Sequence, residues 1–137
     1  MPEPEIVRSP MVNHSMGTTE STFVIQENLA EFQPGGAAGK GIPLHRHRFE
    51  DEAWYVLEGR LRFQYGAREF EVGGGSGVLL PRGVPHTFWN PGTAPARYLL
   101  IMGPKTAGLL EVLHASSPPP PAGLKAVYDT FEIDLLE

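Results

Sequence analysis

The fold is decided by the stretch GKGIPLHRHRFEDEAWYVLEG, which covers residues 39–59. It places His45 and His47 one residue apart, and alternate side chains of a β-strand point to the same face, so both imidazoles should project in one direction. A second stretch, GSGVLLPRGVPHTFWN at residues 75–90, puts His86 directly after a turn rich in proline and glycine, where a later strand begins. We therefore expect three imidazoles to meet inside the fold, two from one strand and one from another.

A carboxylate should complete this histidine cluster. Glu52 follows His47 by five residues, an odd offset that would place it on the other face of an unbroken strand, so a bend within residues 48–51 is needed. Glu50 competes for the role because it shares the strand parity of Glu52. We favour Glu52 and expect Glu50 at the solvent-facing rim. Three neutral imidazoles and one carboxylate would suit a single divalent transition metal, namely Fe, Mn, Ni, Co, Cu or Zn.

Short apolar runs separated by glycine and proline fill the chain around the histidines. The sequence contains 16 glycines and 14 prolines, which favours tight turns and short strands over long helices. Residues 53–57 and 61–65 predict a hairpin about Gly59, and further runs up to residue 102 add more antiparallel strands. This density of strands is typical of an all-β jelly roll or a similar closed β structure.

The two ends of the chain differ from this central part. The first residues show little hydrophobic periodicity, whereas two short helices are predicted beyond residue 105, the second from apolar side chains at helical spacing between residues 124 and 131. We expect one domain with three parts: an N-terminal arm at residues 1–20, a β-barrel at residues 21–104 and a C-terminal helical extension at residues 105–137.

The composition excludes several classes of site and partner. The formal net charge of −5 disfavours nucleic acid and anionic membranes as partners, because both repel an acidic surface. The sequence has no cysteine, which excludes disulfides, thiolate metal sites and cysteine nucleophiles, so a metal must be held by histidine and carboxylate. No run approaches the length of a membrane span, about 18 consecutive apolar residues, and the acidic, proline-rich start is unlike a signal peptide. We expect a soluble, cytoplasmic protein whose partner is a small-molecule substrate or ligand.

Ten residues match the two signature motifs of the cupins in order and spacing. The first motif corresponds to Gly39, His45, His47, Glu52 and Gly59, and the second to Gly75, Pro81, Gly83, His86 and Asn90. The chain therefore resembles a small single-domain bacterial cupin, and its first motif is most similar to that of the quercetin dioxygenase-like members. The resemblance implies a cupin jelly roll, that is, a double-stranded β-helix barrel, with short C-terminal helices. It also implies a metal held by His45, His47, Glu52 and His86.

The resemblance and the ligand set favour a metal-dependent, dioxygenase-like oxidoreductase. Such an enzyme, similar to quercetinases, would act on a small hydroxy-ketone, diketone or aromatic substrate, with Glu52 as metal ligand and catalytic proton acceptor. Two alternatives stay open: a non-catalytic cupin that binds or senses a small molecule, and a metal-dependent isomerase or lyase that needs no oxygen. Trp54, Phe63 and Phe88 are candidates for the wall of a substrate pocket, although an ordinary barrel core explains them equally well. His114 matches neither motif and is assigned no role in the site.

The strand that begins at Glu52 is apolar on both faces. Trp54 and Val56 lie on the face of Glu52, and the alternate positions between them are apolar as well. An outer face of this kind needs a cover, which a second subunit could provide by packing its own sheet there. We therefore expect a homodimer.

Overall fold

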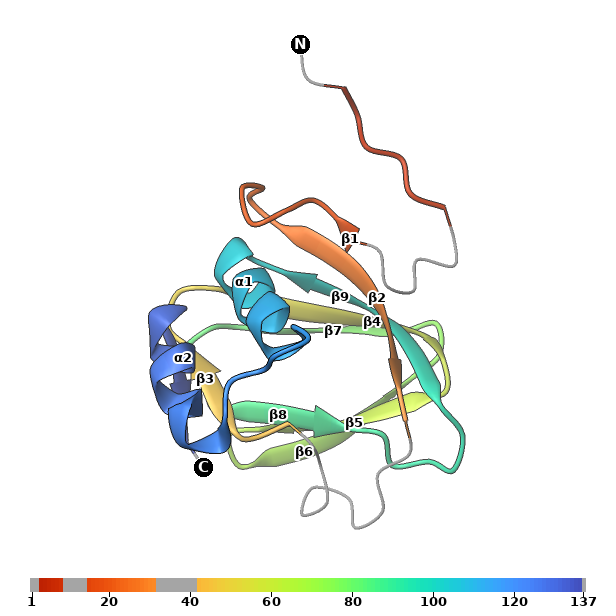
Figure 1. Cartoon of the computed structure of the whole chain (residues 1–137). Coiled ribbons are helices and arrows are strands. Elements are labelled where there is room, and N and C mark those ends of the chain that lie inside the picture. Colours follow the sequence, from red (N-terminus) through yellow and green to blue (C-terminus); the bar gives the residue numbers. More distant parts are fainter. Residues whose placement is uncertain (1–2, 9–14, 32–41, 137) are drawn as a thin grey trace.

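The computed structural model describes residues 3–8, 15–31 and 42–136 (Figure 1). Two five-stranded antiparallel sheets lie face to face, and two short helices lie at one end of the pair. This architecture confirms the expected single-domain, mostly β jelly roll with short helices near the C-terminus. The signature residue Gly39 lies outside the described residues.

The chain crosses repeatedly between the two sheets. In the first sheet the order is β1 (Ser15–Met16), β2 (Val24–Ala30), β9 (Ala96–Met102), β4 (Glu52–Glu58) and β7 (Gly77–Leu80). In the second sheet the order is β10 (Ile133–Leu135), β3 (His45–His47), β8 (His86–Trp89), β5 (Arg60–Tyr65) and β6 (Arg68–Gly73). Consecutive strands such as β3 and β4 therefore face each other across the core instead of lying side by side.

Hydrophobic alternation explains why these segments form strands around a common core. In β9, four buried residues alternate with three half-exposed residues, and β4 begins with the same alternation. The inward side chains of the two sheets meet in a core whose most buried members include Trp54, Val56, Leu61 and Phe63. Burial of each such side chain contributes about 1.5–3 kcal/mol. The facing sheets are therefore held together mainly by this apolar layer.

Gly59 marks a corner and not the hairpin that the sequence predicts. β4 and β5 run on either side of it but belong to different sheets, and β5 pairs with β6 and β8. Gly59 has a φ of +80°, which glycine adopts at little cost, and a Cβ there would lie 3.0 Å from the Cα of Ala96. The glycine does signal a sharp turn, but the local sequence does not specify which neighbour each flanking strand will pair with.

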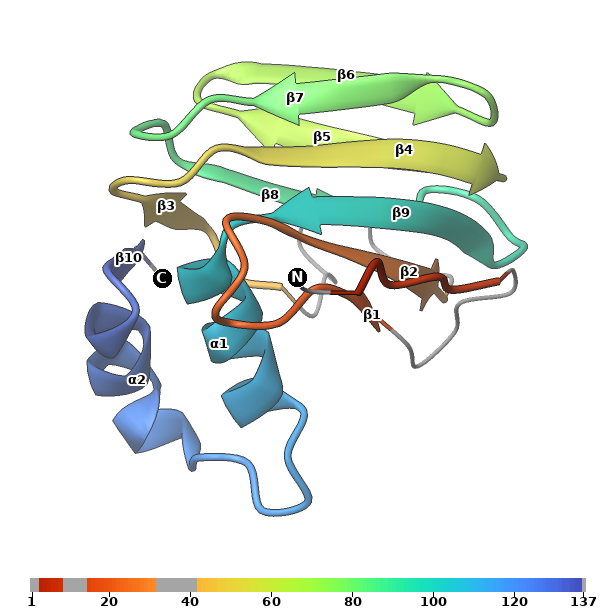
Figure 2. The same ribbon diagram turned by 90° about the horizontal axis from the view of Figure 1, so that it is seen from above.

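Two helices follow β9 and cover one end of the sheets (Figure 2). α1 (Pro104–Leu113) begins with proline in its first turn, and α2 (Leu124–Thr130) follows a 3₁₀ turn at Pro121–Gly123. A second, smaller core of Leu109, Tyr128 and Ile133 joins α1, α2 and β10. β10 pairs with β3, so the C-terminal part adds a strand beside the histidines as well as the two helices. None of the helices in the described ranges has the length and apolar content needed to span a bilayer.

Replacing Gly59 with alanine should destabilise the fold more than the same change at Gly75. The φ angles of the two glycines are +80° and +86°, and such a conformation costs other residues about 1–3 kcal/mol. Only at Gly59 would the new Cβ also press on the Ala96 backbone, because none of the described atoms lies within 4 Å of a Cβ built at Gly75. Urea unfolding measures the two losses in free energy of unfolding. Equal losses would contradict the steric role of the Gly59 corner.

Candidate metal centre

β3 and β8 bring the three histidines together. His45 and His47 are buried while Arg46 between them is half-exposed, as alternate residues of a strand should be. His45 lies directly opposite His86 in the antiparallel pair of β3 and β8. The imidazole centroids are 4.6 Å apart for His45 and His86, and 5.2 Å apart for His47 and His86. The structure thus contains the meeting of three imidazoles that the sequence motifs predict.

Glu52 reaches the same point from the opposite sheet. The chain bends at residues 48–49 and crosses to the first sheet, where Glu52 opens β4 and is buried. Its Oε1 lies 3.1 Å from Nε2 of His47 and 3.1 Å from Nε2 of His86. One possible ligand atom from each of the four residues lies within 4.8 Å of all the others, and all four residues are buried. We call His45, His47, Glu52 and His86 the histidine–glutamate cluster.

The outer nitrogens of two imidazoles are held by backbone carbonyls. Nδ1 of His45 lies 2.8 Å from the carbonyl oxygen of Pro43, and Nδ1 of His86 lies 3.3 Å from that of Val84. A carbonyl only accepts hydrogen bonds, so each Nδ1 carries a hydrogen, and in the neutral rings the lone pair is therefore on Nε2. This is the tautomer in which a histidine binds a metal through Nε2.

The donor set fits a divalent transition metal. Nε2 of His47 is buried and has no hydrogen-bond partner within the described residues, although Oε1 of Glu52 lies 3.1 Å away. A buried polar atom without a partner is costly, and a cation held between the Nε2 atoms and the carboxylate would satisfy all of them. Imidazole and carboxylate ligands suit Fe, Mn, Ni, Co, Cu and Zn.

The cluster is electrostatically prepared to bind a cation at neutral pH. Burial, together with repulsion from His86 and His47 whenever these rings carry a second proton, lowers the pKa of His45 to about 4, so this imidazole stays neutral and can coordinate. Burial alone would raise the pKa of Glu52, but the charge of His47 and the contacts with His86 outweigh it and hold the pKa well below its usual range. Glu52 is therefore ionised when a metal arrives.

Glu50 has a different place from the solvent-facing rim expected for it. It lies before β4 begins, so the parity argument that placed it on the same face as Glu52 does not apply. Its carboxylate accepts hydrogen bonds from the backbone N–H groups of Lys105 and Thr106, at 2.9 Å and 2.8 Å. Glu50 therefore caps the N-terminus of α1, where a negative charge also interacts favourably with the helix dipole.

Comparison with known proteins identifies the family. A sequence model of the cupin domain matches residues 28–102, more than half of the chain. The chain belongs to the cupin family. Among its curated relatives are the tetracenomycin polyketide synthase protein TcmJ of Streptomyces glaucescens, 29% identical over 85 residues (62% of this chain, 56% of TcmJ), and polyketide synthase CurC of Streptomyces cyaneus, 32% identical over 66 residues (48% of this chain, 43% of CurC).

Solved structures support the same cupin fold. A sugar phosphate isomerase of the cupin superfamily from Silicibacter pomeroyi has a TM-score of 0.52 and 27% identity to this chain, covering 61% of this chain and 51% of that one. The chain spans about half the length of the curated relatives it matches, from 41% to 56%. None of the three relatives named here carries a dioxygenase name, so the finer resemblance to quercetin dioxygenases gains no support from them.

The histidine–glutamate cluster of this cupin borders a cavity of about 590 Å³. His45, His47 and Glu52 lie in its wall. Much of the remaining wall is apolar and includes Ile42, Phe88, Leu100, Leu109, Leu110 and Leu113. A cavity of this size and character can hold a small organic molecule.

The three aromatic residues proposed for a substrate pocket separate in the structure. Phe88 lines the cavity, whereas Trp54 and Phe63 lie in the core, with ring centroids 5.1 Å apart. The indole of Trp54 meets the ring of His86 edge-on at 5.9 Å. Trp54 therefore packs against a residue of the cluster from within the core and is not among the residues that line the cavity.

Tyr98 and Asn28 are cavity residues that the sequence analysis did not identify. They face each other across β2 and β9, and their side chains are hydrogen-bonded. Burial, and to a smaller degree the charge of Glu52, raises the pKa of Tyr98 well above its ordinary value, so the hydroxyl stays protonated. Strand parity places Tyr98 on the same face of β9 as the cavity residue Leu100. The local sequence does not show, however, that β2 is the strand beside β9. His114, assigned no role above, also lines the cavity.

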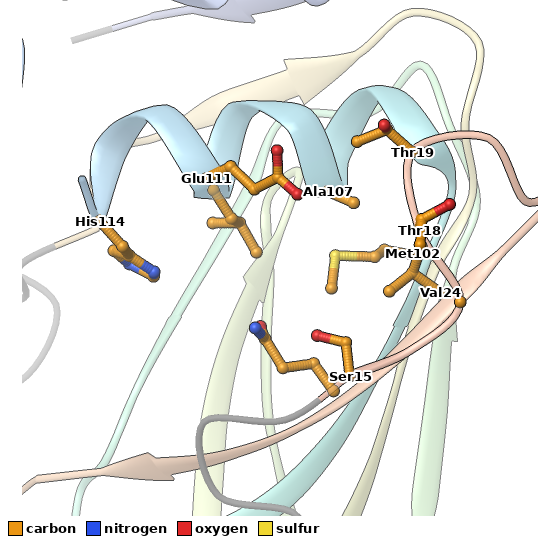
Figure 3. Close-up of a pocket in the computed structure, with 11 residues that line it drawn as sticks. Ser15, Thr18, Thr19, Val24, Met102, Ala107, Glu111 and His114 are labelled. Atoms are coloured by element: carbon orange, nitrogen blue, oxygen red, sulfur yellow. The ribbon is translucent and has the colours of Figure 1, made fainter. Parts of the chain in front are cut away.

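A second cavity of about 280 Å³ lies between α1 and the segment from β1 to β2 (Figure 3). Its wall includes Ser15, Thr18 and Glu111 but no member of the histidine–glutamate cluster. Gln26, Leu110 and His114 line both cavities. The two cavities are therefore neighbours beneath α1.

Loss of one imidazole should abolish tight metal binding. His86→Ala removes a buried nitrogen and should weaken affinity for Zn²⁺ or Co²⁺ by more than about 100-fold, since loss of an outer hydrogen-bond partner alone costs about 10- to 100-fold. His114→Ala is the matched control because His114 lines the cavity outside the cluster. Competition with a chromophoric chelator measures affinity, and circular dichroism verifies folding. Unchanged affinity in folded His86→Ala would refute the proposed ligand set.

Proposed function

We propose that this cupin binds a divalent metal at the histidine–glutamate cluster and uses it to cleave a small chelating substrate with dioxygen. The observation that carries the proposal is the position of four buried metal-binding side chains beside a largely apolar cavity of about 590 Å³. An ion held there would polarise the oxygens of a bound hydroxy-ketone or diketone and lower the pKa of its hydroxyl or C–H group. In the reaction a carbon–carbon bond breaks and both oxygen atoms enter the products.

The charge of the site supports a monoanionic substrate. A divalent ion and the Glu52 carboxylate leave a net charge of about +1, which an enolate or phenolate would neutralise. Much of the surrounding wall is apolar, and the hydroxyl of Tyr98 and the amide of Asn28 add neutral hydrogen-bonding groups. A further carboxylate in the wall, that of Glu27, is paired with Arg97 at 3.1 Å. Two relatives are polyketide synthase proteins, and polyketides carry ketones in the 1,3 relation that favours such enolates.

Glu52 and Tyr98 have different roles towards the protons of a bound substrate. Glu52 is ionised, so it can accept a proton, but a carboxylate with so low a pKa takes one only from an acidic group. The enol of a diketone or the hydroxyl of an aromatic hydroxy-ketone has this acidity once it contacts a cation. Tyr98 keeps its proton and can donate a hydrogen bond to a substrate oxygen. These roles narrow the substrate to acidic, oxygen-chelating compounds.

A second candidate function is a metal-dependent isomerase or lyase. The similarity to a solved sugar phosphate isomerase favours it, because enolisation of a hydroxy-ketone uses the same polarising ion and proton acceptor without oxygen. A non-catalytic cupin that holds its ligand unchanged is the third possibility. Turnover and its requirement for oxygen together separate the three functions.

Iron-loaded protein should consume oxygen when it is given a flavonol or an aryl 1,3-diketone. We expect oxygen uptake in proportion to substrate lost, and a fall to background in His86→Ala. An oxygen electrode and product analysis make the measurement. Turnover under nitrogen would identify the isomerase or lyase instead, and substrate recovered unchanged from a complex in air would identify a binding protein. Either outcome would reject the dioxygenase.

We also propose that a second copy of the chain covers the outer face of the first sheet. Phe23, Phe49 and Leu79 are 57–61% exposed, and they line one shallow groove together with Ala53 and Ile101. The apolar outer positions of β4 that suggested a homodimer therefore belong to a wider apolar surface.

A charge in this groove should dissociate the homodimer. Leu79→Glu would place a carboxylate at the centre of the covered surface, where burial without a partner costs several kcal/mol, and it should give a monomer. Leu136→Glu, also at an exposed leucine but after β10 in the second sheet, serves as the control. Light scattering coupled to gel filtration reads the mass. A wild-type monomer, or a dimer that persists in Leu79→Glu, would rule out this interface.

A further inference from the structure

The three imidazoles are anchored on their outer side in two different ways. His45 and His86 each donate from Nδ1 to the carbonyl of the residue two positions earlier in the chain. Nδ1 of His47 instead lies 3.1 Å from Oγ1 of Thr106, which is 59 positions away in α1. The outer partner of His47 is therefore present only when α1 is docked against the sheets.

The hydrogen-bond directions around Thr106 are fixed by its neighbours. Its hydroxyl donates to Oε1 of Glu50 at 2.8 Å, and this uses the single hydrogen of the hydroxyl. Oγ1 can then only accept, so the hydrogen in its contact with His47 belongs to Nδ1. This selects for His47 the same tautomer that the carbonyls select for His45 and His86, with the lone pair on Nε2.

The Glu50–Thr106–His47 chain is closely packed, with Glu50 half-buried and the other two residues shielded from water. Thr106 and His47 are each 3% exposed. Glu50 is held by the N–H groups of Lys105 and Thr106, and a Cβ at Gly103 would overlap its carboxylate. Any displacement of the first turn of α1 would therefore move the acceptor away from His47.

We propose that Thr106 is a positioning residue of the metal centre and that metal binding is coupled through it to the docking of α1. The inference rests on the proposed metal-binding function. α1 contributes Leu109, Leu110 and Leu113 to the cavity wall, so the same helix that orients a metal ligand also closes the substrate cavity. By linkage, if docked α1 raises the metal affinity, the bound metal stabilises docked α1 by the same factor.

A role limited to helix stability would give different results. Thr106 lies in the first turn of α1, where its hydrogen bond to Glu50 also supports the helix. If that were its whole function, removing the hydroxyl would lower the free energy of unfolding of the metal-free protein but leave the metal affinity of the folded protein unchanged. Metal affinity and the spectrum of the bound ion therefore separate the two roles.

The test compares Thr106→Val, which keeps the shape of the side chain, with Thr106→Ser, which keeps the hydroxyl. Thr106→Val should bind Co²⁺ about 10- to 100-fold more weakly than wild type and should change the visible spectrum of the bound ion, whereas Thr106→Ser should restore both. Thr130→Val is the matched control, because the hydroxyl of Thr130 donates only to the carbonyl of Ala126 within α2. It should bind Co²⁺ as wild type does.

Hydrogen exchange gives a second readout. Co²⁺ should slow amide exchange in α1 of the wild-type protein and of Thr106→Ser, and this added protection should be lost in Thr106→Val. If Thr106→Val does not fold, Glu50→Gln weakens the same chain from its other end and should lower the affinity in the same direction.

The outcomes distinguish the inference from the function on which it rests. Wild type that binds Co²⁺, with equal affinity, spectrum and α1 protection in Thr106→Val, would overturn the coupling and leave the metal centre standing. Wild type that binds neither Co²⁺ nor Zn²⁺ would overturn the metal centre and the coupling together. Weaker binding in Thr130→Val to the same degree would show that the effect is not specific to Thr106, and would also reject the proposal.

Discussion

The structure depends on the burial of three imidazoles and one carboxylate at a single point between two sheets. Such groups cost several kcal/mol in an apolar interior unless every polar atom finds a partner. The outer nitrogens meet this requirement through the carbonyls of Pro43 and Val84 and the hydroxyl of Thr106. In the neutral rings the inner nitrogens are acceptors, as the carboxylate oxygens of Glu52 are, so a bound cation would satisfy them together. A shift of β3, β8 or the start of β4 would break several of these contacts at once.

The short strand β3 could not hold two of these histidines alone. It has three residues, and it is paired on one side with β8 and on the other with β10 from the end of the chain. Arg46 on its outer face and Arg48 directly after it both contact Asp134 of β10, at 3.0 Å and 2.6 Å. Exposed ion pairs contribute at most about 1 kcal/mol each, so the backbone pairing matters more. β10 therefore supports β3 at its edge, while Thr106 of α1 contacts His47 directly.

The candidate site could be predicted from the sequence where the geometry is local. The same-face placement of His45 and His47 follows from strand parity, and the need for a bend before Glu52 follows from the odd offset. The position of Glu50 could not be obtained in this way, because parity fails once the strand ends, and its partners lie more than fifty residues away. Thr106 is likewise an ordinary residue of the first helical turn until tertiary packing sets it against His47. The predicted pairing of β5 with β4 is wrong for the same reason. The local sequence specifies the turn at Gly59 but not the sheet that β5 joins.

The ionised carboxylate of Glu52 and the neutral hydroxyl of Tyr98 determine which proton transfers the proposed reaction can use. The carboxylate of Glu52 is kept ionised by the histidines around it, while the hydroxyl of Tyr98 is kept neutral by burial and by that same carboxylate. Over the neutral pH range Glu52 can therefore accept a proton, whereas Tyr98 keeps its own and can donate a hydrogen bond. A ligand that approaches as a weak acid and leaves its proton with Glu52 would present a single negative charge to the ion and an oxygen to Tyr98. The apolar part of the wall, which includes Phe88, Leu100 and Leu109, then favours a compound whose remaining surface is mainly hydrocarbon.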